Sequence, residues 1–112
     1  ASRVVITPAA PVWMAGYASR TKPAEGKIHD LYARALALEG RDGQRVVSVS
    51  LDVCGIPRDV HDRIAEAMKD AVAPSHLMIN CSHTHSGPAV GHNLRDAYPV
   101  DYKEGAKISA YT

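Results

Sequence analysis

The hydrophobic and polar positions at the start of the chain predict one short strand followed by a long loop. Residues 3–6 (RVVI) are mostly β-branched and end at Thr7 and Pro8, which favours a strand that stops at a turn. Residues 8–27 are rich in proline, glycine and alanine and follow neither the strand nor the helix period. Because a loop of about 20 residues in a compact domain is usually functional or disordered, this segment is a candidate for a functional loop.

The next two segments predict a hairpin. Residues 30–39 contain alanine and leucine, which favour a helix, but the segment is short and a Gly-Arg-Asp-Gly turn follows it at residues 40–43. In residues 45–53, Val47 and Val49 alternate with serines, a pattern typical of a half-buried strand. Because such a turn commonly joins two strands, we interpret residues 30–39 as the partner strand.

A βαβ unit is predicted in the second half of the chain. Val60 and Ile64 recur at helical spacing within residues 58–72, and a proline precedes this segment. Residues 76–81 then have the pattern of a buried strand. Since a helix joins them, the strands at 45–53 and 76–81 must run parallel, and their carboxyl ends lie at the same edge of the sheet. Ligands of open α/β sheets bind beyond this edge.

These elements predict an α/β fold in which a mixed sheet includes the βαβ unit. The segment from Gly91 onward loses periodicity and gains tyrosines and charges, so we expect a surface excursion there. A length of 112 residues allows a single domain, residues 1–112, with one modest core. It is short for a complete enzyme of most hydrolase families.

The sequence Ser-His-Thr-His-Ser-Gly-Pro at residues 82–88 follows the second parallel strand. In an extended backbone, side chains two residues apart point to the same face, so His83 and His85 are expected to converge on one ion or one substrate atom. Neutral imidazole is the commonest zinc ligand, but a catalytic zinc typically has three protein ligands. The pair is therefore an incomplete site by itself, and a histidine pair at a strand end can also be an ordinary polar feature.

Three neighbouring residues are candidates for contacts with a substrate or with the ligand histidines: Asp52, Ser86 and Gly87. Asp52, at a strand end, either orients a ligand histidine or caps the following turn. Gly87 allows backbone amides to approach a ligand closely. Cys54 and Cys81 are expected near the two parallel strand ends, and we interpret them as buried free thiols without a metal role.

The long loop carries further candidates. Trp13, Met14 and Tyr17 form either an apolar wall for a lipid-like substrate or a plug over the core. The basic residues Arg20 and Lys22 are most simply a solvated face.

Composition excludes several classes of partner. The chain has 13 basic and 12 acidic residues, so it generates no broad field that would attract nucleic acid or an anionic membrane surface. No apolar run approaches the roughly 20 residues that a membrane helix needs, and the first residues lack the layout of a signal peptide. Two cysteines are too few for a disulfide scaffold.

Four segments resemble, in order and spacing, the N-terminal part of neutral/alkaline non-lysosomal ceramidases: residues 7–20, 26–39, 45–57 and 80–91. The family carries Met-x-Gly-Tyr-Ala, then a Gly-Ile-His stretch before an Ala-Arg-Ala strand, then an Arg-Val-Val strand that ends in Asp. Its last motif, Thr-His-Thr-His-Ser-Gly-Pro, is quite specific. The resemblance covers about residues 4–95 of this chain.

The resemblance implies a zinc-dependent amidase that hydrolyses the N-acyl bond of ceramide or a related lipid amide. It makes His83 a zinc ligand, and it makes His85 the residue that contacts the substrate or the oxyanion and assists proton transfer. In the family the remaining ligands, a histidine, a glutamate and a tyrosine, come from much further along a longer chain. The resemblance therefore implies that residues 1–112 are the N-terminal portion of a larger catalytic domain. The resemblance also suggests a secreted or periplasmic location.

An alternative is a truncated, non-catalytic module without a complete metal site. Such a chain could form a homo-oligomer by covering its exposed sheet edge with a second copy. The amount of zinc bound per chain distinguishes the two hypotheses.

Overall fold

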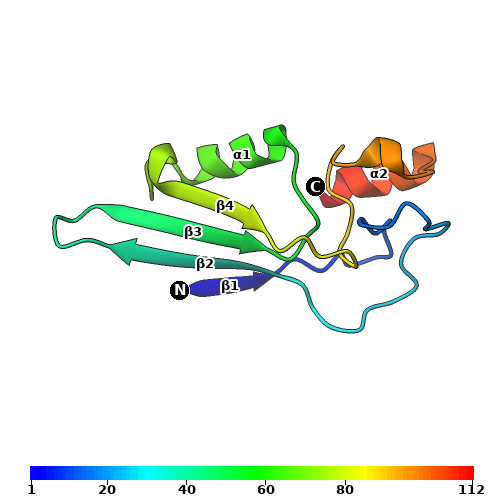
Figure 1. The fold of residues 1–112 in the computed structure, drawn as a ribbon, viewed down its shortest axis with the longest axis horizontal. Helices are drawn as coiled ribbons and strands as arrows, with labels where there is room; N and C mark the ends of the chain where they lie inside the picture. The colour runs from blue at the N-terminus through cyan, green and yellow to red at the C-terminus, as the bar shows by residue number, and fades with distance from the viewer.

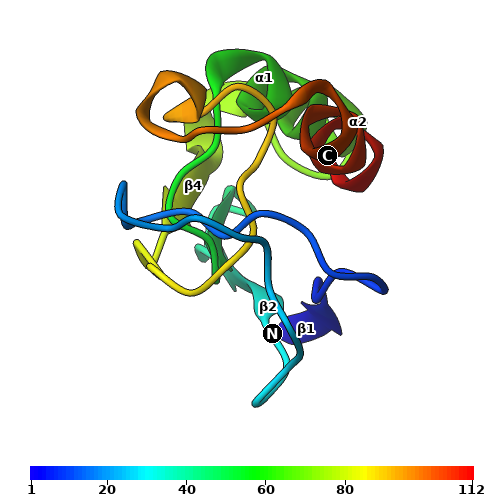
Figure 2. The same cartoon turned by 90° about the vertical axis from the view of Figure 1, so that its right-hand side faces the viewer.

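The computed structural model describes residues 1–112 as a four-stranded sheet with helices on one side (Figures 1 and 2). The strands and helices are β1 (Ser2–Val5), β2 (Tyr32–Glu39), β3 (Arg45–Leu51), α1 (Arg58–Met68), β4 (Leu77–Cys81) and α2 (Tyr102–Tyr111). Two short 3-10 turns, Pro74–His76 and Arg95–Ala97, precede β4 and α2. Neither helix is both long enough and apolar enough to cross a membrane.

The sheet is mixed and has the order β1-β2-β3-β4. The pairs β1–β2 and β2–β3 are antiparallel, whereas β3 and β4 are parallel and place Leu51 opposite Cys81. The predicted hairpin, the βαβ unit and the α/β class are thus confirmed, and residues 30–39 supply a strand despite their helix-favouring composition. Pairing with strands on both sides outweighs the weak local preference of alanine and leucine.

Helix α1 is shorter than the predicted helix over residues 58–72, because it ends at Met68. The N–H groups of Ala71 and Val72 both donate to the carbonyl of Met68, so the chain tightens into a turn. Pro74 then holds Ala73 in an extended conformation, as proline does to the residue before it. Val72 lies in this turn and is buried in the core between the sheet and α1.

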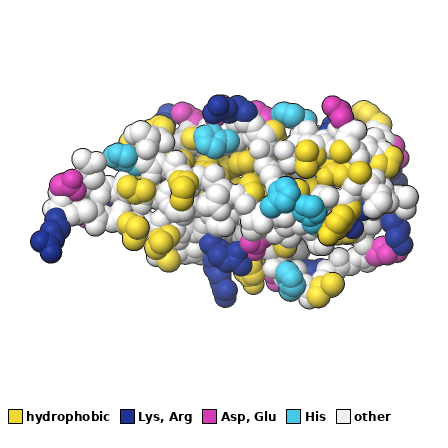
Figure 3. Space-filling model, in the orientation of Figure 1, with side chains coloured by type: hydrophobic (Ala, Val, Ile, Leu, Met, Phe, Trp, Pro, Cys, Tyr) yellow, Lys and Arg dark blue, Asp and Glu magenta, His cyan; other side chains and the backbone are white.

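One face of the sheet forms the first core against α1. The buried side chains of this cluster are Val47, Val49, Leu51, Val53, Val60, Val72 and Val90. β3 contributes Val47, Val49 and Leu51 to this core, because every second side chain of a strand points to the same face of the sheet. The other face exposes four apolar side chains, Leu36, Leu38, Val46 and Met78. Figure 3 shows apolar side chains at the surface of the half of the molecule that contains the sheet.

The segment after Gly91 is not the surface excursion that the sequence predicts. It forms α2, whose first turn is capped by Asp101 through a hydrogen bond from the Glu104 N–H. Ile108 is only 1% exposed and Tyr98 is buried. The sequence pattern missed this because the apolar positions of the segment are few and their packing partners lie far away in the chain.

Those partners form a second core cluster made by the long loop and α2. Its members are Val12, Trp13, Ala15, Cys54, Ala89, Tyr98 and Ile108. Trp13 is 3% exposed, so of the two readings for this side chain the plug is correct, whereas Tyr17 lies on the surface. The loop that carries Trp13 is therefore part of the folded body and lies close to residues 88 and 89, which follow the histidine segment.

Replacement of Ile108 by alanine tests the second cluster. Because this side chain is almost fully buried, Ile108→Ala should reduce the free energy of unfolding by about 2–5 kcal/mol. Urea denaturation followed by the fluorescence of Trp13, which packs in the same cluster, measures the change. Tyr102→Ala, at a position 92% exposed on the same helix, is the control and should stay within about 0.5 kcal/mol of the parent. Equal effects of the two changes would contradict the packing described.

Tyr111 gives the fold a pH dependence in the alkaline range. Its hydroxyl donates to the carbonyl of Ile6 at 2.7 Å, and burial raises the pKa of Tyr111 to about 12. An unfolded tyrosine ionises near about pH 10, so the folded state holds this proton more tightly. The associated stability is complete below about pH 10 and is lost as the pH rises through about 12.

We therefore expect Tyr111→Phe to lose less stability across that window than the parent chain does. Urea midpoints of both proteins, measured at several pH values from neutral to strongly alkaline, test this. The comparison removes the contribution of the other ionising groups, because both proteins share them. Parallel curves would show that Tyr111 ionises equally easily in the folded and unfolded states.

Candidate metal centre

The parallel pairing of β3 and β4 continues past the ends of both strands. The N–H of Ser82 donates to the carbonyl of Leu51 at 3.0 Å, and the N–H of Thr84 donates to the carbonyl of Val53 at 3.2 Å. The histidine segment therefore runs beside the residues that follow β3. This brings Cys54 next to His83, although 29 positions separate them in the chain.

The two histidines lie together, as expected, but the backbone between them is not extended. His83 has a φ of 57°, in the left-handed region that only glycine adopts easily. The rings of His83 and His85 are nevertheless 4.7 Å apart between centroids and inclined by 60°. The expectation of convergence holds, while its premise of strand geometry is wrong because β4 ends at Cys81 and the chain turns there.

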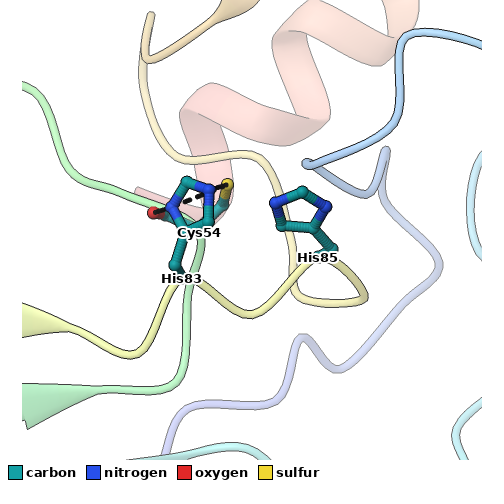
Figure 4. A group of neighbouring side chains, drawn as sticks. All are labelled: Cys54, His83 and His85. Carbon is teal, nitrogen blue, oxygen red and sulfur yellow. Dashed lines mark hydrogen bonds between the residues drawn. The ribbon is translucent and has the colours of Figure 1, made fainter.

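Cys54, His83 and His85 form a group of three donor side chains (Figure 4). One ligand atom from each residue lies within 4.8 Å of the others. The sulfur of Cys54 is 3.7 Å from Nδ1 and 3.9 Å from Nε2 of His83. Cys54 is buried, His85 is half-buried and His83 is exposed, so the group joins a buried sulfur to a surface imidazole. Figure 3 shows adjacent histidine side chains at the surface near the strand ends.

A backbone contact fixes which nitrogen of His83 is free. Nδ1 lies 2.9 Å from the carbonyl oxygen of Cys54, and a carbonyl can only accept a hydrogen bond. Nδ1 therefore carries the proton, and Nε2 keeps the lone pair that a metal ion requires. Together with a second imidazole and a thiol, this donor set fits zinc, which binds nitrogen and sulfur ligands. The sequence interpretation of Cys54 overlooked its position beside this ring.

Burial also affects the thiol. It raises the pKa of Cys54 above the usual value, because the thiolate loses hydration in the core cluster. The free thiol is therefore protonated at neutral pH and inert as a nucleophile. Coordination to a metal ion is the interaction that would deprotonate it.

His85 is held by the long loop. Gly16 has a φ of 106°, and a Cβ at this position would lie 2.4 Å from Cγ of His85, so only glycine allows the loop to pass here. The Tyr17 ring meets the His85 ring edge-on, with centroids 4.9 Å apart. Arg20 lies over the Tyr17 ring and donates to the carbonyl of His85 at 2.7 Å. Arg20 is thus not the solvated residue that the sequence suggested.

Backbone pairing keeps this loop in register with the histidine segment. The N–H of Ala15 donates to the carbonyl of Gly87 at 2.9 Å, and the N–H of Ala89 donates to the carbonyl of Trp13 at 2.8 Å. The N–H of Gly87 itself donates to the carbonyl of Thr84 at 3.3 Å. Both backbone groups of Gly87 are therefore used within the fold, and its amide does not point freely at a ligand.

The carboxylate of Asp52 binds residues of β2 and does not hydrogen-bond to either histidine. Its carboxylate accepts hydrogen bonds from the Tyr32 N–H at 2.9 Å and from the Arg34 guanidinium at 2.7 Å. Burial opposes ionisation of this carboxyl, but the two hydrogen bonds outweigh burial, and the net effect is to lower the pKa of Asp52. Asp52 thus holds the start of β2 against the end of β3, the position in which it caps the end of its own strand.

Ser86 lies at the wall of a largely apolar cavity of about 430 Å³, whose lining includes the two neighbours of His85 in the chain but not Cys54, His83 or His85 themselves. Thr84 and Pro88 contribute to the same wall, and the long loop supplies most of the remainder, including Val12, Met14 and Leu31. One wall of the cavity is therefore formed by the histidine segment, residues 82–88. Lys22, in contrast, pairs with Glu25 on the surface, as its assignment to a solvated face implies.

Residues 2–102 match the family described as neutral/alkaline non-lysosomal ceramidase, N-terminal. Neutral ceramidase 1 of Arabidopsis thaliana is 36% identical over 85 residues, which cover 72% of this chain and 11% of that protein. The neutral ceramidase of Oryza sativa subsp. japonica is 35% identical over the same shares. Neutral ceramidase B of Dictyostelium discoideum is 33% identical, over 71% of this chain and 12% of its own length.

Solved structures show the same relationship. The neutral ceramidase from Pseudomonas aeruginosa superposes with a TM-score of 0.70 and 28% identity, over 95% of this chain and 18% of that one. A structure described as ceramidase complexed with C2 gives a TM-score of 0.71 over the same shares. The chain thus spans only 11–12% of the length of the plant and Dictyostelium relatives and 18% of the chains of known structure. Its motifs, its mixed sheet and these matches together establish that the chain belongs to the neutral/alkaline non-lysosomal ceramidase family.

Proposed function

We propose that this chain provides metal-binding and catalytic residues of a zinc-dependent hydrolase that cleaves the N-acyl amide bond of ceramide or a related lipid amide. The observation that carries the proposal is the meeting of His83 and His85 beyond the parallel strand ends, in a chain of the ceramidase family. This is the edge at which open α/β sheets bind their ligands. A non-catalytic module would have no need for two imidazoles held together there.

His83 is the proposed zinc ligand, through Nε2. The hydrogen bond from Nδ1 to the carbonyl of Cys54 selects the required tautomer and fixes the direction of the ring. The left-handed backbone of His83 supports this role, since strained conformations of this kind cluster at functional sites. A zinc ion bound there supplies Lewis-acid chemistry: it polarises an amide carbonyl and makes water a stronger acid.

His85 is the proposed acid/base residue. The contacts of its ring with Tyr17 and of its carbonyl with Arg20 limit its freedom to move, which favours proton transfer at a defined position. A neutral imidazole can accept a proton from water and return it to the leaving amine. Because the amide of Gly87 is engaged with Thr84, stabilisation of the oxyanion is assigned to the cation and to His85.

The cavity next to the histidines supports a substrate with an apolar chain. Its lining combines alanine, proline, valine and leucine residues with a few polar ones, among them Thr84 and Ser86. Apolar walls with a few placed polar groups are typical of sites for small molecules. In this proposal, Ser86 contacts the polar head of the lipid amide. A Cβ at Gly87 would lie 3.0 Å from the carbonyl oxygen of Asp52, so glycine lets the histidine segment pack closely against the end of β3.

Replacement of His83 tests the metal site. His83→Ala should remove stoichiometric zinc from the full-length protein, because the imidazole with the free Nε2 is lost. Plasma mass spectrometry of the dialysed protein measures the metal. His92→Ala, which removes an exposed histidine outside the group, is the matched control and should keep its zinc. Absence of zinc from the parent protein would favour the non-catalytic, self-associating module instead.

Replacement of His85 tests the separation of roles. His85→Ala should keep the zinc but reduce turnover of a ceramide substrate by roughly 10²–10⁴-fold, the usual contribution of an acid/base residue. The released fatty acid and sphingoid base report the rate. Normal turnover in this variant would contradict the assignment, whatever its zinc content.

A further inference from the structure

We propose that Arg20 is a positioning residue for His85, because its guanidinium holds both the backbone of this histidine and the aromatic ring that packs against the imidazole. The inference rests on the proposed acid/base role of His85 and adds the residue that keeps it in place. The sequence pattern gave no reason to choose Arg20, which lies 65 positions away from His85. The contacts in the folded chain supply that reason.

The ring of His85 has no hydrogen bond that orients it within this chain. The ring of His83 differs, because its Nδ1 donates to the carbonyl of Cys54, as Figure 4 shows. His85 instead contacts two other rings, those of His83 and Tyr17, with centroids 4.7 and 4.9 Å away. Its orientation therefore depends on what fixes its backbone and the Tyr17 ring.

His85 lies in a tight turn whose central peptide is held by Arg20. The N–H of Gly87 donates to the carbonyl of Thr84 at 3.3 Å and closes the turn, so the His85 carbonyl belongs to the central peptide. The common turn types differ by a flip of this peptide. Arg20 donates to the His85 carbonyl at 2.7 Å, and this charge-assisted hydrogen bond opposes the flip. The same bond thereby also fixes the backbone of Ser86, the next residue of the turn.

The same guanidinium also holds the ring that packs against the imidazole. Cζ of Arg20 lies 5.3 Å from the centroid of the Tyr17 ring, a distance at which an aromatic face attracts a cation. Tyr17 is 53% exposed, so packing in the core does not fix its ring. The Tyr17 ring in turn meets the His85 ring edge-on. One side chain therefore fixes two supports of His85.

Arg20 has no competing partner within this chain. Lys22, two positions further along the loop, pairs with Glu25, whereas Arg20 forms no ion pair with an acidic side chain. Its Nε is buried without a hydrogen-bond partner, so the guanidinium is anchored by the His85 carbonyl and the Tyr17 ring. A lysine could donate to the carbonyl, but it has no planar group to stack on the tyrosine.

Kinetics of the full-length protein with a fluorescent short-chain ceramide test this inference. Arg20→Met keeps an apolar side chain but removes the donor and the charge. It should lower kcat roughly 10–100-fold, with KM within about twofold of the parent, because a misplaced catalytic group costs rate rather than affinity. The zinc content should not change, and Arg20→Lys should recover part of the loss. Lys22→Met removes a cation from the same loop and is the matched control, for which kcat and KM should equal those of the parent.

A double variant shows whether Arg20 acts through His85. In the His85→Ala background, Arg20→Met should cause no further loss of turnover, because the group that Arg20 positions is absent. Full kcat in Arg20→Met, loss of its zinc, or an undiminished effect in the His85→Ala background would each overturn the inference. If Arg20→Met does not fold, Arg20→Lys decides: it should lower kcat in the parent but not in the His85→Ala background, and full kcat would overturn the inference.

The outcomes separate this inference from the proposed function. If His85→Ala lowers turnover while Arg20→Met and Arg20→Lys keep the kcat of the parent, His85 retains its proposed role and Arg20 is not its positioning residue. If His85→Ala turns over substrate normally, the acid/base role is wrong and the inference about Arg20 falls with it.

Discussion

The parallel pairing of β3 and β4 is the interaction on which the rest of the structure depends. Parallel strands require a crossover, so α1 must cover one face of the sheet and both strands must end at the same edge. The pairing then continues beyond the strands through the N–H groups of Ser82 and Thr84. This continuation carries the histidine segment alongside Val53 and Cys54, and it creates the donor group.

A second constraint comes from the long loop, which packs on the histidine segment from the other side. Its backbone pairs with residues 87–89, and Trp13 anchors it in a core cluster that includes Ile108 of α2. Gly16 crosses directly over His85 because no side chain would fit there. The loop and the C-terminal helix are thus as much part of the site's support as the sheet is, although neither supplies a donor atom.

Between these two supports the chain holds His83 in a conformation that costs about 1–3 kcal/mol for a residue other than glycine. Two hydrogen bonds offset that cost: Nδ1 of His83 donates to the carbonyl of Cys54, and the N–H of Thr84 donates to the carbonyl of Val53. In return, the ring of His83 points toward the sulfur of Cys54 and the ring of His85, as Figure 4 shows. Local strain and the candidate metal centre therefore coincide in one residue.

The sequence by itself determined the elements whose signals are local. The alternation in β3 predicted its two faces, the helical spacing of Val60 and Ile64 predicted α1, and the crossover rule then fixed the parallel direction of β4. The same reasoning placed His83 and His85 at the edge where the parallel strands end, and the sequence motifs indicated the ceramidase family that the family match shows.

The tertiary structure decided what depends on contacts between distant segments. Packing against Trp13 turned the weakly patterned tail into α2, and the carboxylate of Asp52 accepts a hydrogen bond from Arg34 of the neighbouring strand. The proximity of Cys54 to His83 joins residues that are 29 positions apart, and Arg20 reaches the carbonyl of His85 over 65 positions. No periodicity within a segment encodes such contacts, because they exist only once the strands have paired and the loop has closed over them.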